Sequence, residues 1–143
     1  MNDDTAISFG TSGLRGPADG FTPSRVAAYV GAFLERVAPE GERIVVIGAD
    51  LRESSPRIAA LCVAAAEQAG FDVVYAGNVP TPALAAYAMA RNWPGMMVTG
   101  SHIPESHNGL KFYRRDGEFL KEDEEPVQRA ADARLTEGAD LNT

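Results

Sequence analysis

Ser101 and Lys111 lie in one stretch, VTGSHIPESHNGLKFY (residues 98–113), that concentrates reactive side chains. The chain has two histidines and two lysines, and this stretch holds both histidines, His102 and His107, together with one lysine. A serine hydroxyl in a sharp loop can act as a nucleophile or carry a phosphoryl group, and the free backbone N–H groups of such a loop bind anions. A lysine can lose its proton when its pKa is lowered, whereas an arginine effectively cannot. These residue types indicate nucleophilic or anion-binding chemistry at Ser101.

Two other interpretations of this stretch are a serine hydrolase and a solvated surface turn. A serine hydrolase is disfavoured, because the frame V-T-G-S-H-I-P around Ser101 lacks the G-x-S-x-G elbow and no residue that orients a base can be identified. Each residue taken singly also fits a solvated surface turn. The cluster of a serine, two histidines, an asparagine and a lysine within eleven positions favours a functional loop instead.

Three hydroxyl–proline pairs predict where helices begin, with the hydroxyl at the N-cap and Pro at the first helical position. The pairs are Thr22-Pro23, Ser55-Pro56 and Thr81-Pro82. Apolar residues at helical spacing follow the first two pairs, and Gly70 is expected to end the second helix. The third helix is expected to run to about Asn92, and residues 120–135 predict a polar helix.

Short apolar runs between the helices predict buried strands at residues 44–47, 73–75 and 96–98. Residues 110–113 indicate a further short strand, antiparallel and at an edge. The alternation predicts a three-layer α/β/α domain with a mostly parallel (mixed) sheet. Ligands of such sheets bind beyond the carboxyl ends of the strands, so one functional rim is expected. The loops expected there are residues 48–55, 77–81 and 99–109.

Composition narrows the class of protein. The chain of 143 residues is 45% hydrophobic and 23% charged, which is typical of one globular domain. No apolar run is long enough to span a bilayer, and the acidic residues 1–4 do not resemble a secretory signal, so no membrane and a cytoplasmic location are expected. The net charge of −7 comes mainly from residues 116–143, and no basic stripe suits a nucleic acid. The single Cys62, among apolar neighbours, is expected to be a buried structural thiol.

Four segments together resemble the α-D-phosphohexomutase family. The segment TGSHIPESHNGLKFY (99–113) is similar to the family's active-site serine loop, and FGTSGLRG (9–16) to its N-terminal motif. The segments GADLRESSP (48–56) and GNVPTPAL (77–84) resemble two further family motifs. The four stand in the family's order and cover the chain to about residue 135.

The resemblance implies a mutase that moves phosphate between O1 and O6 of a hexose through a bisphosphorylated sugar, with hexose 1,6-bisphosphate as activator. It implies that Ser101 carries the phosphoryl group, with Mg²⁺ on one phosphoryl oxygen and the remaining metal ligands on an absent domain. Lys111 matches the family lysine that exchanges protons with the sugar hydroxyl, and His102 the histidine that supports the phosphoserine. Arg15 is expected to contact phosphate oxygens, and Ser12 to line the site.

Other residues of these motifs are expected to have structural roles. Arg52 is expected to brace the loops rather than to contact substrate, and His107 to be solvated. The pair Asn108-Gly109 is typical of a turn, because both residues tolerate positive φ. Ile103 departs from the asparagine that many relatives have after the histidine, so any polar contact of that asparagine is missing.

Family members are longer, with four domains, and the chain contains no carboxylate-rich stretch like the family's Asp-Gly-Asp-Ala-Asp metal loop. Residues 1–135 are therefore expected to form the phosphoserine domain I, and residues 136–143 a tail or the start of a linker to an absent second domain. The expected function is that of an intramolecular phosphotransferase, incomplete and inactive alone, whose partners are a hexose phosphate and the remaining mutase domains. Phosphomannomutase/phosphoglucomutase activity is favoured, with mannose, glucose and glucosamine phosphates open. The alternative is a non-catalytic sugar-phosphate or anion-binding module on the same fold.

Overall fold

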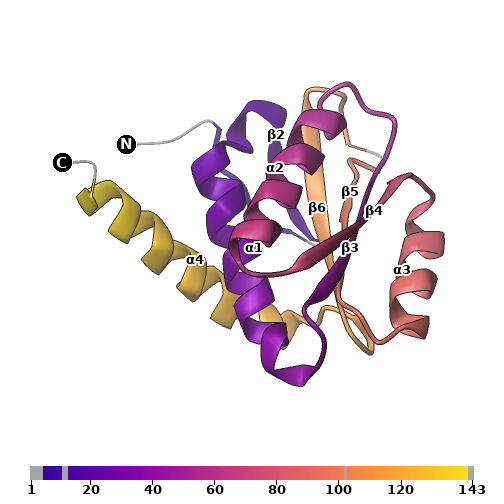
Figure 1. Ribbon diagram of the computed structural model, residues 1–143. Helices are drawn as coiled ribbons and strands as arrows, with labels where there is room; N and C mark the ends of the chain where they lie inside the picture. The colour runs from indigo at the N-terminus through magenta and orange to yellow at the C-terminus, as the bar shows by residue number, and fades with distance from the viewer. Residues whose placement is uncertain (1–4, 11–12, 102, 142–143) are drawn as a thin grey trace.

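A mixed sheet lies between two layers of helices in the computed structural model, which describes residues 5–10, 13–101 and 103–141 (Figure 1). The strands are β1 (Ser8–Phe9), β2 (Leu14–Pro17), β3 (Ile44–Ala49), β4 (Asp72–Asn78), β5 (Gly95–Val98), β6 (His107–Arg114) and β7 (Gly117–Glu118). The helices are α1 (Pro23–Val37), α2 (Ser55–Gln68), α3 (Thr81–Ala90) and α4 (Lys121–Leu141), with 3-10 turns at Ala18–Gly20 and Ala38–Glu40. The predicted three-layer α/β/α architecture is confirmed.

The sheet has the strand order β1-β2-β6-β5-β3-β4, and β7 pairs with β6. Strands β5, β3 and β4 are parallel, while the other pairs are antiparallel. The mixed character is therefore as predicted, but the parallel part is limited to three strands. The strand predicted at residues 110–113 is antiparallel, as expected, but its predicted place at an edge is wrong. It lies inside the sheet, because β2 pairs with its other side.

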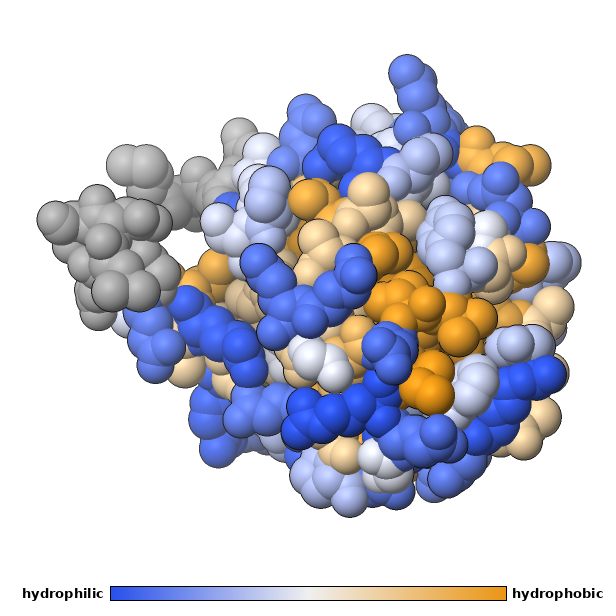
Figure 2. Space-filling view, in the orientation of Figure 1, coloured by the Kyte–Doolittle hydropathy of each residue, from blue (hydrophilic) through white to orange (hydrophobic). Residues whose placement is uncertain are grey.

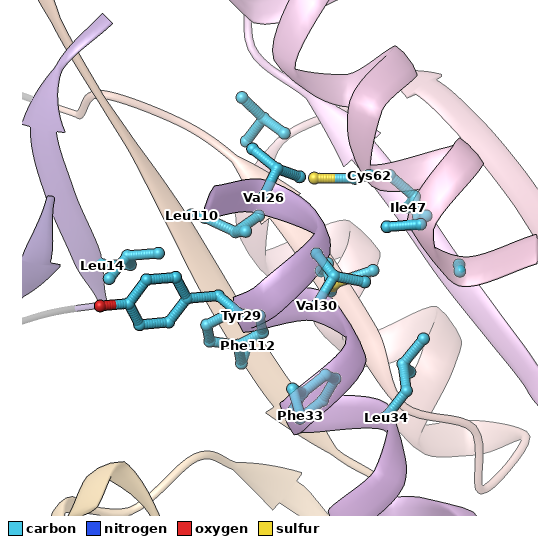
Figure 3. Close-up of a cluster of buried hydrophobic side chains, with 14 of the residues drawn as sticks. Leu14, Val26, Tyr29, Val30, Phe33, Leu34, Ile47, Cys62, Leu110 and Phe112 are labelled. Atoms are coloured by element: carbon cyan, nitrogen blue, oxygen red, sulfur yellow. The ribbon is translucent and has the colours of Figure 1, made fainter. Parts of the chain in front are cut away.

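Helices α1, α2 and α4 cover one face of the sheet, and α3 packs on the other face over β3 and β5 (Figure 1). The main core lies under α1, where Leu14, Phe33, Ile47 and Leu110 are completely buried (Figure 3). Cys62 is also completely buried in this core, and burial raises the pKa of its thiol to about 12. The prediction of a buried structural thiol is confirmed.

The three predicted helix starts differ in how they are capped. The Thr22 hydroxyl accepts a hydrogen bond from the backbone N–H of Arg25 at 3.2 Å, as an N-cap should. Ser55 lies inside α2 and its hydroxyl donates to the Asp50 carboxylate instead, and Thr81 makes no side-chain cap bond. The predicted caps at Ser55 and Thr81 were therefore wrong. In the first case the helix begins at Ser55 itself, so Ser54 and not Ser55 holds the N-cap position.

The predicted end of α2 agrees with the structure, whereas that of α4 does not. Gly70 follows α2 with φ +85°, so it ends the helix in the left-handed conformation that was expected of it. Helix α4 runs to Leu141 and is longer than the polar helix predicted for residues 120–135. Residues 136–141 are thus helical; their use as a linker stays a prediction. In the described part of the chain, no helix is both long and apolar enough to cross a membrane.

The α3 face of the sheet is divided into an apolar and a polar half. Figure 2 shows apolar side chains gathered between β4 and α3, where a groove is lined by Val46, Val74, Tyr75, Ala76, Val79, Ala83, Leu84 and Tyr87. On β2 and β6 the alternation of side chains places Leu14 and Leu110 in the main core, so Arg15 and Lys111 lie on the α3 face. The polar part of this face adjoins the rim, where the loops with reactive side chains lie.

Candidate functional site

The loops after β3, β4 and β5 gather at one edge of the sheet, as predicted. The backbone N–H of Asp50, directly after β3, donates to the Val98 carbonyl at 2.8 Å. The Asn78 amide, at the end of β4, donates to the carbonyls of Ala49 and Asp50 at 3.2 Å each. The Thr99 N–H donates to the Gly109 carbonyl at 3.0 Å and so ties the start of the serine loop, defined here as residues 99–107, to β6.

Ser101 is exposed at the tip of this rim and has a left-handed backbone conformation, with φ +54°. A non-glycine residue in this conformation costs about 1–2 kcal/mol relative to the right-handed region, so the surrounding structure must hold it. Its N–H donates to the Thr99 hydroxyl at 3.2 Å, and its carbonyl accepts from Arg52. The serine is therefore fixed through its backbone while its side chain is left accessible.

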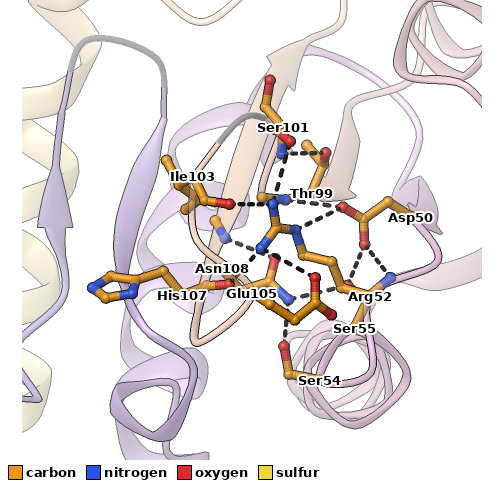
Figure 4. Close-up of polar contacts among 12 residues, drawn as sticks. Asp50, Arg52, Ser54, Ser55, Thr99, Ser101, Ile103, Glu105, His107 and Asn108 are labelled. Atoms are coloured by element: carbon orange, nitrogen blue, oxygen red, sulfur yellow. Dashed lines mark hydrogen bonds and ion pairs between the residues drawn. The ribbon is translucent and has the colours of Figure 1, made fainter.

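The Arg52 guanidinium braces the serine loop from below (Figure 4). Nη1 donates to the carbonyls of Pro104 at 2.7 Å and His107 at 3.2 Å. Nη2 donates to the carbonyls of Ser101 at 3.2 Å and Ile103 at 2.5 Å. The prediction that Arg52 braces loops is confirmed. The Ile103 contact is made by the main chain, so the departure from asparagine at this position does not affect it.

The Asp50 carboxylate organises the base of the same loop. Oδ2 accepts from the Gly100 N–H at 2.9 Å and lies 3.6 Å from Arg52 Nε. Oδ1 accepts from the Arg52 N–H at 3.0 Å and from the Ser55 hydroxyl. Burial alone would raise the pKa of Asp50, but the hydrogen bonds from Ser55, the backbone of Arg52 and Gly100, and Thr99 hold the pKa below its ordinary value. The carboxylate therefore stays charged at neutral pH.

Asn108 and His107 have different surroundings from those that the sequence indicated. Asn108 is completely buried within β6, and its amide donates to the hydroxyls of Ser54 at 2.8 Å and Ser55 at 3.0 Å. The turn predicted at Asn108-Gly109 was wrong: both residues pair with β2, and neither has a positive φ. His107 is half-buried rather than solvated, and its Nδ1 lies 3.0 Å from the Ser106 hydroxyl.

Arg15 and Lys111 are brought together by the pairing of β2 with β6. Arg15 is opposite Gly109, and Lys111 is two residues further along the same face, so the two side chains are diagonal neighbours. Gly13, with φ +81°, lets the N-terminal loop pass close to this pair, because a Cβ there would lie 3.2 Å from Lys111 Cγ and 2.8 Å from the Leu110 carbonyl oxygen. The N-terminal motif and the lysine after the serine loop thus meet in space.

Arg15 and Lys111 also differ from every other cationic side chain of the protein. Among the described residues, neither makes a hydrogen bond or an ion pair, and both are half-buried. The other eleven arginine and lysine side chains each donate at least one hydrogen bond. Two cations without partners among the described residues, on strands that adjoin the serine loop, form a site suited to an anionic ligand such as a phosphate.

Two predicted site residues, Ser12 and His102, lie outside the described residues. Asp50 and Asn108 are polar site residues for which the sequence analysis predicted no such contacts. The spacing of Asp50 and Arg52 could have indicated an Asx turn, in which the carboxylate accepts from the N–H two residues later. No sequence signal predicts the contact between Asn108 and the two serines at the start of α2, because it depends on how β6 packs beside that helix.

A magnesium ion is not accommodated by the described residues alone. Among them, no group of three or more His, Cys, Asp or Glu side chains converges to hold a metal. The Asp50 carboxylate accepts hydrogen bonds on both oxygens, and Mg²⁺ prefers an octahedral set of oxygen ligands that one serine hydroxyl cannot supply.

Comparison with known proteins agrees with the family resemblance of the sequence motifs over almost the whole chain. Residues 6–136 match the family model described as phosphoglucomutase/phosphomannomutase, alpha/beta/alpha domain I. A phosphomannomutase of Sinorhizobium fredii is 46% identical over 139 residues, covering 90% of this chain and 29% of the relative. A phosphoglucosamine mutase of Methylobacterium nodulans is 37% identical over 141 residues, covering 93% of this chain and 32% of the relative.

A solved structure of similar fold comes from Burkholderia thailandensis, a protein described as belonging to the phosphoglucomutase/phosphomannomutase family. It superposes with a TM-score of 0.72 and 30% sequence identity, covering 85% of this chain and 29% of that one. The chain spans less than a third of the length of the curated relatives that it matches.

Proposed function

The chain belongs to the phosphoglucomutase/phosphomannomutase family, as its alpha/beta/alpha domain I, and from this premise we propose that it supplies the phosphoryl-carrying serine of a phosphohexomutase. The observation that carries the proposal is the exposed, left-handed Ser101 together with Arg15 and Lys111 on the adjoining strands, the two cations without partners among the described residues. The activity itself is that of the full-length enzyme, meaning this chain joined to the remaining mutase domains.

In the proposed reaction, the Ser101 oxygen carries the phosphoryl group. A hydroxyl oxygen of the hexose phosphate forms a new bond to phosphorus while the bond to the Ser101 oxygen breaks. Lys111 accepts the hydroxyl proton as general base, and the departing Ser101 oxygen takes a proton from His102. The resulting bisphosphorylated sugar then returns its other phosphoryl group to Ser101 in the reverse of this step, with Lys111 giving back the proton. Catalysis of such transfers depends mostly on positioning and on charge neutralisation, which suits a braced serine beside free cations.

Arg15 is proposed to contact the phosphoryl oxygens, since its guanidinium has no other partner among the described residues and its fork matches two oxygens at once. Roles for His102 as a support of the phosphoserine and for Ser12 as a lining residue are proposed from the family motif. Magnesium is proposed for the full-length enzyme, with carboxylate ligands outside this domain.

The substrate is proposed to be a mannose or glucose phosphate. The phosphomannomutase named above is 46% identical to this chain and the phosphoglucosamine mutase 37%, which supports the first class. Comparison of kcat/KM for mannose 1-phosphate, glucose 1-phosphate and glucosamine 1-phosphate would test it; a preference for the amino sugar would contradict it. A cytoplasmic location stays a prediction.

A coupled mutase assay tests the proposed function. With Mg²⁺ and glucose 1,6-bisphosphate, the full-length enzyme should interconvert hexose phosphates, and Ser101→Ala should abolish turnover while Ser106→Ala, in the same exposed loop, should not. The 143-residue chain alone should melt cooperatively without turnover. Turnover that survives Ser101→Ala would contradict the proposal, and a folded full-length protein that binds hexose phosphate without turnover would show a binding module instead.

A further inference from the structure

We propose that Arg52 and Asp50 are positioning residues for phosphoryl transfer: they hold the backbone on both sides of Ser101 so that the serine hydroxyl keeps one direction. The inference rests on the proposed function of Ser101 and extends it to two residues that would touch neither the substrate nor the phosphoryl group. It starts from the left-handed φ of Ser101, a conformation that the loop would leave if its surroundings did not hold it.

Arg52 holds the part of the loop that begins at the serine. Its four terminal N–H groups face four backbone carbonyls, those of Ser101, Ile103, Pro104 and His107. A guanidinium presents five donors in a fixed planar fork, so these contacts fix the carbonyls relative to one another. The side chain is only 11% exposed, and no terminal donor is left for a substrate. This separates Arg52 from Arg15, whose donors are free among the described residues.

Asp50 holds the part of the loop before the serine. Its Oδ2 accepts from the Gly100 N–H at 2.9 Å and lies 3.6 Å from the remaining donor of Arg52, Nε. The same carboxylate therefore anchors the residue before Ser101 and orients the guanidinium that anchors the residues after it. The Asp50–Arg52 pair and the loop form one hydrogen-bonded unit (Figure 4).

Gly100 is what allows the guanidinium to lie against the loop. A Cβ built on this glycine would overlap the Nε, Cζ and Cδ atoms of Arg52. Only glycine at this position leaves room for the arginine, although the φ of Gly100 is not positive. The close approach, and not a left-handed backbone, accounts for the glycine before the serine.

The chain contains a matched control in Arg57. It lies on α2, near Arg52 in sequence, and also donates to backbone carbonyls, those of Phe21 at 2.9 Å and Ala18 at 2.7 Å. These carbonyls belong to the turn before α1 and not to the serine loop. Arg57→Lys therefore removes the same kind of contact without releasing Ser101.

The test compares Arg52→Lys with Arg57→Lys in the full-length enzyme. The rate of Ser101 phosphorylation by glucose 1,6-bisphosphate is followed by rapid quench, together with kcat, KM and amide hydrogen exchange. Displacement of a reacting group by about 1 Å can lower the rate ~10²-fold, so Arg52→Lys should lower kcat by about that factor with KM within about twofold. The amides of Ser101 and Ile103 should exchange faster, and added guanidinium should restore part of kcat to Arg52→Ala. Arg57→Lys should leave all of these values close to those of the unsubstituted enzyme.

Two outcomes would overturn the inference, and they are distinguishable. If the unsubstituted enzyme phosphorylates Ser101 and Arg52→Lys does so equally fast, the positioning role is wrong while the proposed function stands. If the unsubstituted enzyme does not phosphorylate Ser101, the proposed function fails and this inference fails with it.

Discussion

A network built on an aspartate lies at the rim, and another lies at the opposite, far end of the strands. The charged groups have different kinds of partner in the two networks. At the far end, Asp123 is 1% exposed and accepts from Arg36 at 2.9 and 3.1 Å, and Arg114 lies 3.5 Å away. Arg114 also lies 3.8 Å from both Glu40 and Asp116. Arg36 and Arg114 each have a carboxylate partner there, and the network joins α1, the end of β6 and the start of α4.

At the rim, by contrast, Asp50 and Arg52 direct most of their hydrogen bonds to backbone groups, and Arg15 and Lys111 have no anionic partner among the described residues. An unpaired, half-buried cation is unfavourable in the absence of a ligand, so its presence is informative. The difference indicates that charge is balanced within the chain where the fold must be held; at the rim, we propose that a phosphate balances it.

The largest expected effect is that of removing Lys111. In the full-length enzyme, Lys111→Met should lower turnover ~10²–10⁴-fold, the usual loss for a general acid or base, with a smaller change in substrate binding. The melting temperature should be nearly unchanged, because Lys111 has no partner to lose among the described residues. Steady-state kinetics and a thermal melt measure both quantities, with Arg129→Met on the exposed side of α4 as control. Near-normal turnover would make Lys111 an ordinary surface cation.

The second expected effect is a loss of stability at the far end of the sheet, where Asp123 lies. Asp123→Ala should lower the free energy of unfolding of the 143-residue chain by about 2–3 kcal/mol, less than a fully buried pair because Arg36 and Arg114 stay partly exposed. Asp116→Ala is the control, since this carboxylate is 78% exposed, and it should change stability by less than ~1 kcal/mol. Urea denaturation compares the two. Equal effects would mean that the far-end network does not hold the fold.

Acid should weaken both networks. Burial raises the pKa of Asp123, but the Leu120 N–H, the hydrogen bond from Arg36 and the charges of Arg114 and Arg36 lower it below its ordinary value, and Asp50 also has a lowered pKa. A lowered folded-state pKa contributes stability above the unfolded value of about 3.9, and this stability is lost as pH falls through the folded value. Asp123→Asn should therefore flatten the fall in stability on acidification.

Added salt should change the pKa values of the two carboxylates, Asp50 and Asp123, by different amounts. Asp50 is held by hydrogen bonds, whereas Asp123 is also held by the charges of two arginines, so high salt should raise the pKa of Asp123 more than that of Asp50. NMR titration of the two carboxyl groups at low and high salt measures this. Equal responses would contradict the contrast between the networks.

The smallest expected effect is on the free energy of unfolding. It compares the hydroxyl of Thr22, which lies outside the rim, with that of Thr81, at the end of the rim loop after β4. Thr22→Ala removes a cap bond to Arg25 and should cost about 1 kcal/mol. Thr81→Ala removes none and should change the free energy of unfolding by only a few tenths of a kcal/mol. Chemical denaturation of the two variants provides the comparison, and a larger loss for Thr81→Ala would show that the capping assignment is wrong.

Much of the fold could be predicted because apolar parallel strands have a plain signal, although the strand predicted as buried at residues 73–75 is the partly exposed edge strand β4. Strands β3, β4 and β5 appear in the sequence as short apolar runs between helices. Strands β1 and β2 were not predicted, since these two- and four-residue segments acquire strand structure only by pairing, β2 with β6 and β1 with β2. The same pairing turned Asn108-Gly109, which is typical of a turn, into the interior of a strand.

Residues of the candidate site could be proposed from the sequence where residue type carried the signal, and the sequence missed those whose part in it depends on tertiary contact. Ser101, Lys111 and Arg15 were singled out by their motifs, and the bracing role of Arg52 was expected. The contact of Asp50 with Gly100 joins residues 50 positions apart, and only the pairing of β3 with β5 brings them together. Sequence spacing within one loop cannot indicate such contacts.

The most direct test of the account is to find where the phosphoryl group is carried. The full-length enzyme is incubated with hexose 1,6-bisphosphate, and its intact mass and phosphopeptides are measured, with Ser106→Ala as control. The account predicts a single phosphoryl group, on Ser101, in both the unsubstituted and the Ser106→Ala proteins. A phosphoryl group on Thr99 or Ser106, with Ser101 unmodified, would contradict it.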